Sequence, residues 1–280
     1  SWRYKQRCEN TFTRNVRSSR INRIRKKNMN RTIIITGATG KFGKILVKYF
    51  LENEDKVIAI GKSKNLLSQL KNNIQQNVRN LYLIKANLMA KTGCDTIAKT
   101  LKKEKLKPDC LINNARNLKN LETNKREEVS SNNFLNEFKL GVVAPYELTI
   151  KLVDLFSDSL RNIVNIGSIY GSIVPNLKLY KSGLIPPPIN YGVTKAALEQ
   201  LTKELAVRLA KKNIRVNCVA FGGVEGRARN NFKKKYSELC PSGRMLQESE
   251  ICGPVDMILS KKTSGMTGHI LMVDGGWSLW

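Results

Sequence analysis

Tyr191 and Lys195 are the two side chains of this sequence whose types and spacing best suit acid–base chemistry. On a helix, residues four apart lie on one face, one turn from each other. A free phenol has a pKa of about 10 and is a poor acid at neutral pH, but a neighbouring ammonium group lowers that value. Such a pair can protonate or deprotonate an alcohol. The same spacing also arises by chance on exposed helices of a lysine-rich chain. Whether Tyr191 and Lys195 form a catalytic pair or an exposed helix face therefore depends on the rest of the sequence.

The composition fits one folded domain with a large excess of positive charge. The chain has 280 residues, of which 41% are hydrophobic, and a net charge of +27. This length supports one α/β domain, and no apolar run reaches the roughly 18 residues of a membrane span. Six cysteines without a CxxC pair and a single histidine argue against a zinc site. We therefore expect no metal, no membrane contact, and reduced thiols in a cytoplasmic protein.

Residues 1–30 are predicted to be a disordered basic arm that precedes a folded domain over residues 31–280. Residues 1–31 hold eleven Lys or Arg and one acidic residue, without a hydrophobic period. The arm is interpreted as sequence upstream of a start at Met29, as a targeting peptide, or as a tether to nucleic acid or a membrane surface; we favour the first. The charge of the remaining chain reflects compositional bias or attracts an anionic cofactor and substrate. Nucleic-acid binding is not favoured.

A glycine-rich turn between a strand and a helix predicts a phosphate-binding site at the start of the domain. Residues 31–35 form a β-branched apolar run, typical of a buried parallel strand, and an amphipathic helix is expected over 44–51. Glycines between them permit a tight turn and close approach to a pyrophosphate, and the helix N-terminus adds free N–H groups. The predicted cofactor contacts in this turn are Gly37, Thr39, Gly40, Lys41, Phe42 and Gly43.

The end of the next predicted strand, residues 56–60, indicates which dinucleotide binds. NAD sites usually place Asp or Glu there to hold the ribose 2′-hydroxyl, whereas this chain has Gly61 followed by Lys62. A carboxylate would repel a 2′-phosphate, and Lys62 together with Lys41 would attract one. NADP is therefore the predicted cofactor, with NAD as the alternative.

Further strands complete a repeating strand–helix order. A third strand over 81–86 ends at Asn87 and Leu88, where the adenine is expected, and a fourth over 109–112 runs into residues 113–115. This order predicts a single α/β domain with a doubly wound parallel sheet, Rossmann-like, in three layers.

The motifs together resemble those of the short-chain dehydrogenase/reductase family over residues 31–280. They stand in the family's order: 36–43, 113–115, 165–168, 191–195, 215–223 and 267–276. The resemblance implies an NAD(P)-dependent oxidoreductase. In it Tyr191 is the acid/base, Lys195 lowers the pKa of Tyr191 and binds the nicotinamide ribose, and Ser168 orients the substrate carbonyl or hydroxyl. It also implies cofactor contacts from Asn113, Asn114, Ala115, Gly222 and Val224.

The sequence departs from the family pattern at three places. Gly141 stands where the family commonly has an Asn that holds a water in the proton relay, which suggests a weakened relay. Arg116 replaces the usual Gly after Asn-Asn-Ala; it either reaches a phosphate or an acidic substrate, or faces solvent. Residues 221–225 replace the usual Pro-Gly, so the family's Thr contact to the cofactor is not evident.

A long proline-containing segment between Ser168 and Tyr191 narrows the family resemblance to one subgroup. Its two ends are catalytic, so it must pass over the active site. With residues 217–224, 243–245 and 273–280 it resembles a bacterial subgroup of flagellin modification and nonulosonic-sugar biosynthesis. The resemblance implies a sugar-related substrate and a homodimer or homotetramer. The alternatives are a 3-oxoacyl-carrier-protein-type ketone reductase, and a catalytically weak dinucleotide-binding sensor or scaffold motivated by Gly141.

Overall fold

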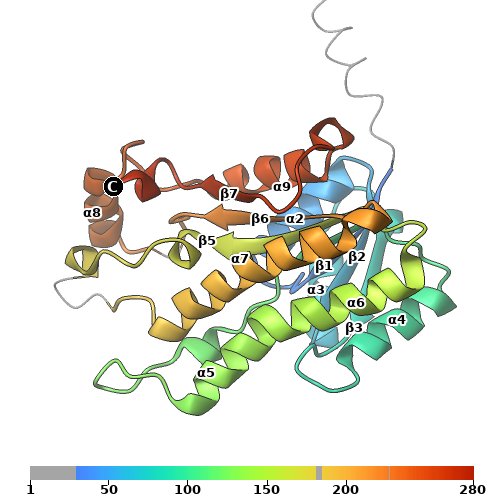
Figure 1. The fold of residues 1–280 in the computed structure, drawn as a ribbon, viewed down its shortest axis with the longest axis horizontal. Coiled ribbons are helices and arrows are strands. Elements are labelled where there is room, and N and C mark those ends of the chain that lie inside the picture. Colours follow the sequence, from blue (N-terminus) through green and yellow to red (C-terminus); the bar gives the residue numbers. More distant parts are fainter. Residues whose placement is uncertain (1–29, 181–184, 227) are drawn as a thin grey trace, which may run out of the picture. The chain divides into compact units, whose positions relative to one another are not determined.

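Seven parallel strands form one sheet in the order β3-β2-β1-β4-β5-β6-β7 (Figure 1). The computed structural model describes residues 30–180, 185–226 and 228–280, so the predicted arm, except Asn30, lies outside the described residues. The strands are β1 Thr32–Thr36, β2 Lys56–Gly61, β3 Leu81–Lys85, β4 Cys110–Asn113, β5 Asn162–Ser168, β6 Arg215–Phe221 and β7 Ile270–Val273. The predicted doubly wound sheet is confirmed. Because the strand order reverses between β1 and β4, a crevice is expected at their carboxyl ends.

Eight α-helices in the described residues cover the two faces of the sheet. They are α2 Lys41–Glu52, α3 Lys64–Asn72, α4 Gly93–Lys103, α5 Ser131–Phe138, α6 Ala144–Phe156, α7 Ile189–Leu209, α8 Asn230–Leu239 and α9 Cys252–Leu259. Alternation along β1 divides the core: Ile33 and Ile35 pack with α2, α3 and α9, whereas Ile34 packs with α4, α6 and α7. Figure 1 shows α6 and α7 on one side of the sheet and α9 on the other.

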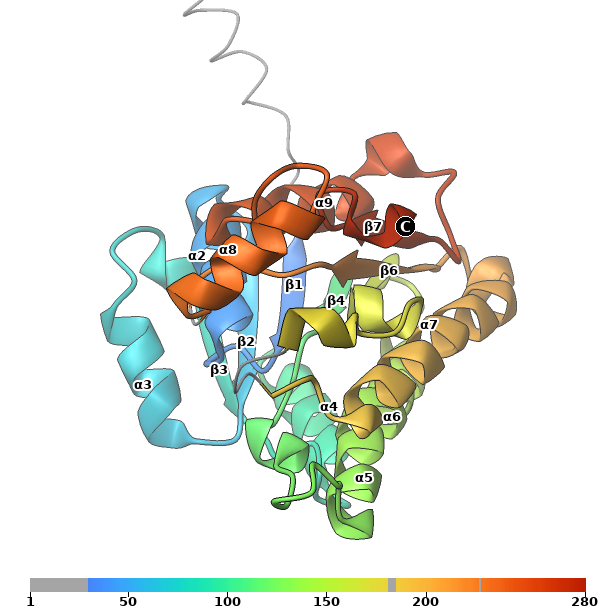
Figure 2. The same cartoon turned by 90° about the vertical axis from the view of Figure 1, so that its left-hand side faces the viewer.

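A smaller aromatic cluster lies beyond the sheet. Tyr236 of α8 stacks on Trp277 with ring centroids 4.2 Å apart, and Ile169 and Leu179 belong to the same buried cluster. In Figure 2, α8 lies beside the short helix Leu177–Tyr180, in the segment that joins β5 to α7. This cluster holds α8 against the long segment between Ser168 and Tyr191.

Helix α2 begins earlier than the sequence indicated. The expected start was residue 44, but the helix begins at Lys41, directly after Gly40. Gly43 therefore lies within the first turn of the helix, where a Cβ atom would lie 2.2 Å from the carbonyl oxygen of Gly37. Only glycine permits this approach, and the second half of the predicted turn is the first turn of the helix. No helix within the described ranges is long and apolar enough to cross a bilayer.

Candidate active site

A cavity of about 800 Å³ opens at the carboxyl ends of the strands, where the sheet topology predicts a ligand crevice. Most of the residues predicted from the sequence as site residues line it: Gly37, Thr39, Gly40, Lys41, Phe42, Lys62, Asn87, Leu88, Asn114, Ala115, Ser168, Tyr191, Lys195, Gly222 and Val224. Gly43 and Asn113 lie behind this lining and support it. The cavity therefore joins the glycine turn to the Tyr191 region in one continuous space.

The glycine turn is tied to the loop after β4 by hydrogen bonds to Thr36, the last residue of β1. The backbone N–H groups of Asn114 and Ala115 donate to Thr36 Oγ1 at 2.9 and 3.1 Å. Asn114 Nδ2 donates to the carbonyl oxygen of Thr36 at 3.0 Å. Gly37 has φ +62°, and a Cβ atom there would lie 2.6 Å from Ala115 Cα. At Gly37 the backbone of the turn therefore faces the cavity without a side chain to cover it.

Buried amides fix the helix that carries Tyr191 and Lys195. Asn113 Nδ2 donates to Asn165 Oδ1 at 2.9 Å, and Asn165 Nδ2 donates to Thr202 Oγ1 at 2.9 Å. The Thr202 hydroxyl donates in turn to the carbonyl oxygen of Leu198 at 2.8 Å. This chain of bonds runs from β4 through β5 into α7. Asn113 therefore acts on the site through α7.

Ser168, Tyr191 and Lys195 face the same cavity from β5 and α7. Lys195 Nζ donates to the carbonyl oxygen of Ile166 at 2.6 Å and lies 5.9 Å from the centre of the Tyr191 ring. The Ser168 hydroxyl is buried and accepts a hydrogen bond from the N–H of Tyr170 at 3.3 Å. No hydrogen bond joins the hydroxyl groups of Ser168 and Tyr191, both of which are described. The arrangement leaves these hydroxyls available to a substrate oxygen.

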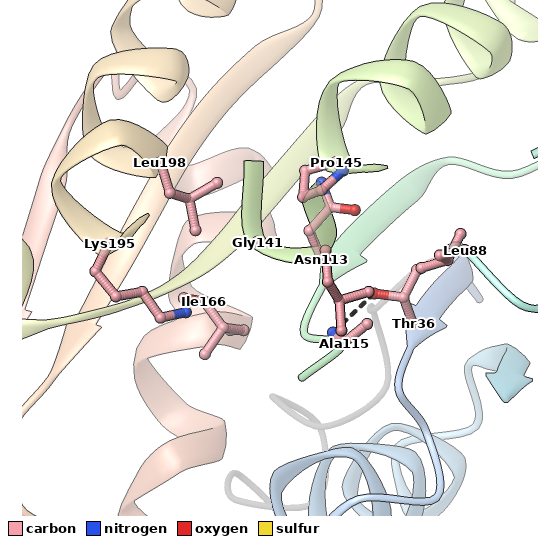
Figure 3. Close-up of a pocket in the computed structure, with 10 residues that line it drawn as sticks. Thr36, Leu88, Asn113, Ala115, Gly141, Pro145, Ile166, Lys195 and Leu198 are labelled. Atoms are coloured by element: carbon pink, nitrogen blue, oxygen red, sulfur yellow. Dashed lines mark hydrogen bonds between the residues drawn. The ribbon is translucent and has the colours of Figure 1, made fainter. Parts of the chain in front are cut away.

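Gly141 lies at a second, very small cavity behind Lys195. A π-helical turn, Lys139–Val143, joins α5 to α6 and carries this glycine. The cavity has a volume of about 10 Å³, close to the minimum for one water molecule. Figure 3 shows Gly141 between Lys195 and Asn113, which both line the cavity. π-Helical turns occur frequently at functional sites.

Arg116, one of the three departures from the family pattern, lines the large cavity. Its guanidinium carbon lies 4.6 Å from the centre of the Tyr191 ring, within the range of a cation–π contact. Arg116 is also exposed, so one side of it meets solvent and the other contacts the Tyr191 ring at the cavity.

Lys41, which was expected to attract a 2′-phosphate, has protein partners. Its ammonium group lies 2.9 Å from a carboxylate oxygen of Glu248 and donates to the carbonyl oxygen of Glu225. Glu225 is also paired with Lys233 of α8 at 3.5 Å. Lys41 therefore connects the start of α2 to the segment around α8, while Lys62 lines the cavity without an ion pair to any described residue.

Four aromatic residues that sequence reasoning missed form a wall of the cavity: Tyr170, Tyr180, Phe232 and Tyr236. The hydroxyl groups of Tyr170 and Tyr180 lie 2.8 Å apart, and burial raises the pKa of both phenols. Tyr236 accepts a hydrogen bond from the N–H of Gly223 at 2.9 Å. Phe232 and Tyr236, four residues apart, were the detectable sign of an aromatic face.

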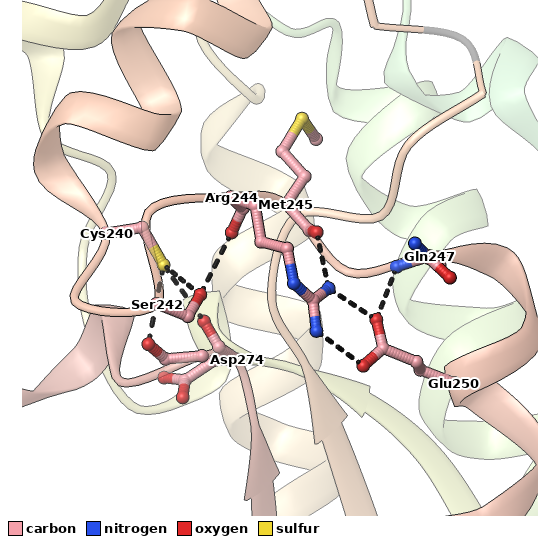
Figure 4. A network of polar contacts seen from close by, with 8 residues as sticks. Cys240, Ser242, Arg244, Met245, Gln247, Glu250 and Asp274 are labelled. Carbon is pink, nitrogen blue, oxygen red and sulfur yellow. Dashed lines mark hydrogen bonds and ion pairs between the residues drawn. The ribbon is translucent and has the colours of Figure 1, made fainter.

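The segment after α8 is fixed by a polar network (Figure 4). Arg244 donates to both carboxylate oxygens of Glu250 at 2.7 and 2.9 Å, and the N–H of Gln247 donates to the same carboxylate at 2.7 Å. The Arg244 guanidinium, followed by the Gln247 N–H, lowers the pKa of Glu250 to about 2. The network holds Leu246, whose N–H donates to the carbonyl oxygen of Gly223 at 2.9 Å. It thereby supports the backbone next to the predicted cofactor contacts.

Comparisons with known proteins identify the family of this chain. The family model described as Enoyl-(Acyl carrier protein) reductase matches residues 37–278. The chain belongs to the short-chain dehydrogenase/reductase family of oxidoreductases, as the motifs predicted.

Individual relatives cover nearly the whole chain. Post-translational flagellin modification protein A of Campylobacter coli is 29% identical over 253 residues, 89% of this chain and 99% of that protein. A 3-oxoacyl-(acyl-carrier-protein) reductase of Buchnera aphidicola is 27% identical over 258 residues, 89% of this chain and 98% of its own length. A solved short-chain dehydrogenase from Leptospira borgpetersenii with bound NAD⁺ has a TM-score of 0.80 at 25% identity, covering 91% of this chain and 95% of that one.

Proposed function

We propose that this protein is a nicotinamide-dinucleotide-dependent oxidoreductase that interconverts a hydroxyl and a carbonyl group on a sugar-related substrate. The single observation that carries the proposal is the shared cavity: Ser168, Tyr191 and Lys195 face the same space as the glycine turn after β1. The likeness to the flagellin modification protein supports the subgroup that the sequence resembles, and that subgroup implies a sugar-related substrate.

The residues of the glycine turn fit a dinucleotide. Gly40 precedes α2 and offers no side chain to cap it, so the N–H groups of the first helical turn are free for a phosphate. Gly37 presents bare backbone on the cavity wall. Lys62 follows Gly61 at the end of β2, where a ribose 2′-phosphate would be attracted, and the Leptospira relative was solved with NAD⁺. We propose NADP as the preferred cofactor and NAD as the alternative.

The protein's own groups position the substrate and move a proton. A bound nicotinamide dinucleotide supplies or accepts the hydride. The Ser168 hydroxyl donates to the substrate oxygen and orients it, and the Tyr191 hydroxyl gives that oxygen a proton during reduction or removes one during oxidation. Lys195 holds a positive charge beside the phenol from its anchor on Ile166. The small cavity at Gly141 is close to the minimum size for one water molecule, which would lie beside Lys195.

A ketone reductase acting on a carrier-bound 3-oxoacyl chain is the second candidate, supported by the likeness to the Buchnera reductase. Two exposed apolar side chains favour it: Ile185, which lines the cavity, is 68% exposed, and Ile189, the first residue of α7, is 70% exposed. A homo-oligomer is also proposed. On α7, Leu205 and Leu209 pack on the sheet, whereas Val207 is 78% exposed and available to a second copy.

Tyr191→Phe tests the proposed function directly. We expect loss of turnover with sugar alcohols or ketones, with little change in dinucleotide affinity measured by thermal shift. A ligand at 100 times its dissociation constant raises the free energy of unfolding by about 2.7 kcal/mol, so binding is readily detected. Turnover retained by Tyr191→Phe would overturn the mechanism. Dinucleotide binding by a wild-type protein that turns over no substrate would favour the sensor or scaffold.

A further inference from the structure

Arg116 is a cationic side chain at the end of the cavity where Tyr191 and Lys195 lie. We propose that its guanidinium group binds a carboxylate of the substrate, so that the enzyme acts on a hydroxy acid or keto acid. This inference rests on the proposed function and specifies its substrate class. It starts from one distance: the guanidinium carbon lies 4.6 Å from the centre of the Tyr191 ring.

The charges around the cavity leave Arg116 available to an anion. None of the described residues that line the cavity is acidic. Four cationic residues line it: Lys41, Lys62, Arg116 and Lys195. Lys41 is paired with Glu248, and Lys195 donates to the carbonyl oxygen of Ile166. Arg116 makes no ion pair or hydrogen bond with any described residue. The cavity therefore carries an unneutralised guanidinium beside the proposed acid/base.

Glu137, the acidic residue whose charge interacts with Arg116 and Lys195, does not occupy the place proposed for the anion. Glu137 of α5 is 3% exposed, accepts a hydrogen bond from Asn120 at 3.3 Å, and is absent from the cavity lining. Burial raises the pKa of its carboxyl group, and Lys195, Asn120 and Arg116 oppose that rise. Glu137 thus stays behind the wall, and the face that Arg116 turns to the cavity remains unpaired.

Geometry favours a carboxylate of the substrate over a phosphate of the cofactor. A guanidinium group matches either anion with two parallel N–H bonds. The predicted phosphate positions are the glycine turn over residues 37–43 and the end of β2 at Lys62. Arg116 lies instead on the ring of Tyr191, whose hydroxyl group meets the reacting oxygen. An anion held there would be a few bonds from the reacting carbon, which a substrate carboxylate satisfies.

Matched pairs of small probes test the proposal without requiring turnover. The dinucleotide-saturated protein is titrated calorimetrically with D-gluconate and D-glucitol, lactate and 1,2-propanediol, and 3-hydroxybutyrate and 1,3-butanediol. We expect the wild type to bind at least one carboxylate tenfold or more tightly than its neutral partner. Arg116→Gln should reduce that ratio to below twofold, and Arg116→Lys should keep part of it. Lys119→Gln is the matched control: Lys119 is exposed, lies three residues further on in the short helix Leu118–Leu121, and is outside the cavity lining.

Each contrary result has a separate meaning. The proposal is wrong if the wild type prefers no carboxylate, or if Arg116→Gln keeps the preference. Tenfold weaker NADP or NAD binding by Arg116→Gln, with the preference intact, would assign Arg116 to a cofactor phosphate. A preference that Arg116→Gln abolishes, in a protein that oxidises or reduces no substrate, would leave the anion site standing and overturn the proposed function instead.

Discussion

Gly141 and Thr194 fit each other across the contact between the π-helical turn and α7. A Cβ atom on residue 141 would lie 2.4 Å from Thr194 Cγ2, closer than side chains approach. Thr194 is fully buried and directly precedes Lys195, so it has little freedom to move aside. The glycine at the position of the family's Asn is therefore matched to a threonine in the catalytic helix.

This fit predicts how an asparagine at position 141 behaves. Gly141→Asn should lower the free energy of unfolding by about 1–3 kcal/mol, as overpacking does, although replacing a helical glycine normally stabilises. Adding Thr194→Ser removes the γ-methyl group and should recover most of the loss. Thr194→Val keeps the γ-methyl group and should not recover the lost stability. The hydroxyl group that this substitution removes has no hydrogen-bond partner among the described residues, so its removal breaks no hydrogen bond there.

Urea unfolding of the single and double variants, analysed as a double-mutant cycle, measures this coupling. A Gly141→Asn variant as stable as the wild type would show that the contact relaxes. Turnover gives a second readout: if the relay is limited by the missing amide, the rate rises in Gly141→Asn/Thr194→Ser and not in Gly141→Asn alone.

Lys62 should determine the choice between NADP and NAD. It lines the cavity beyond Gly61, and a glutamate there would repel a 2′-phosphate but accept a bond from a 2′-hydroxyl. Lys62→Glu is expected to raise the Kd of NADP tenfold or more and to change that of NAD less than twofold. Lys64→Glu is the control, because Lys64 is exposed at the start of α3 and outside the cavity lining. Equal losses for both dinucleotides would contradict a 2′-phosphate contact.

Asn165 should link stability to catalysis through α7. Asn165→Leu breaks the bonds to Asn113 and Thr202 and leaves the buried Asn113 amide without its acceptor, which costs about 1–3 kcal/mol. Because the same bonds hold the helix of Tyr191 and Lys195, kcat should fall as well. Leu70→Ala, a core truncation on α3 with a cost of about 2–5 kcal/mol, is the comparison. Equal kcat in the two variants would show that Asn165 has no positioning role.

The sequence predicted the elements whose pattern is local. The β-branched run of β1 is fully buried on both faces, and the motif order located the cavity lining around Tyr191 and Lys195. What it could not predict depends on partners far along the chain. Tyr236 turns to the cavity because it stacks on Trp277, and Lys41 is paired with Glu248. Such side-chain directions follow from tertiary packing, which periodicity does not contain.

The ion pair of Arg244 and Glu250 should make stability depend on acidity in a defined range. The guanidinium group, followed by the Gln247 N–H, lowers the folded-state pKa of Glu250 from 4.5 to about 2. A carboxyl group with a lowered folded-state pKa contributes stability that is fully present above its unfolded pKa and is lost as the pH falls toward the folded value. The contribution should therefore disappear between about pH 4.5 and pH 2. It should be modest, because both side chains are partly exposed.

Urea unfolding of the wild type and Glu250→Gln at pH 7, 5, 4 and 3 measures this contribution. We expect the difference in unfolding free energy to be constant at pH 7 and 5 and to shrink at pH 4 and 3. In an Arg244→Gln background the guanidinium is gone, so the same substitution should have a smaller effect and a weaker pH dependence. A difference in unfolding free energy that persists unchanged at pH 3 would mean that Glu250 acts through packing and not through its charge. Loss of the Glu250 ion pair should also loosen the backbone at Gly223, because Leu246, which donates to the Gly223 carbonyl oxygen, is held by the same network.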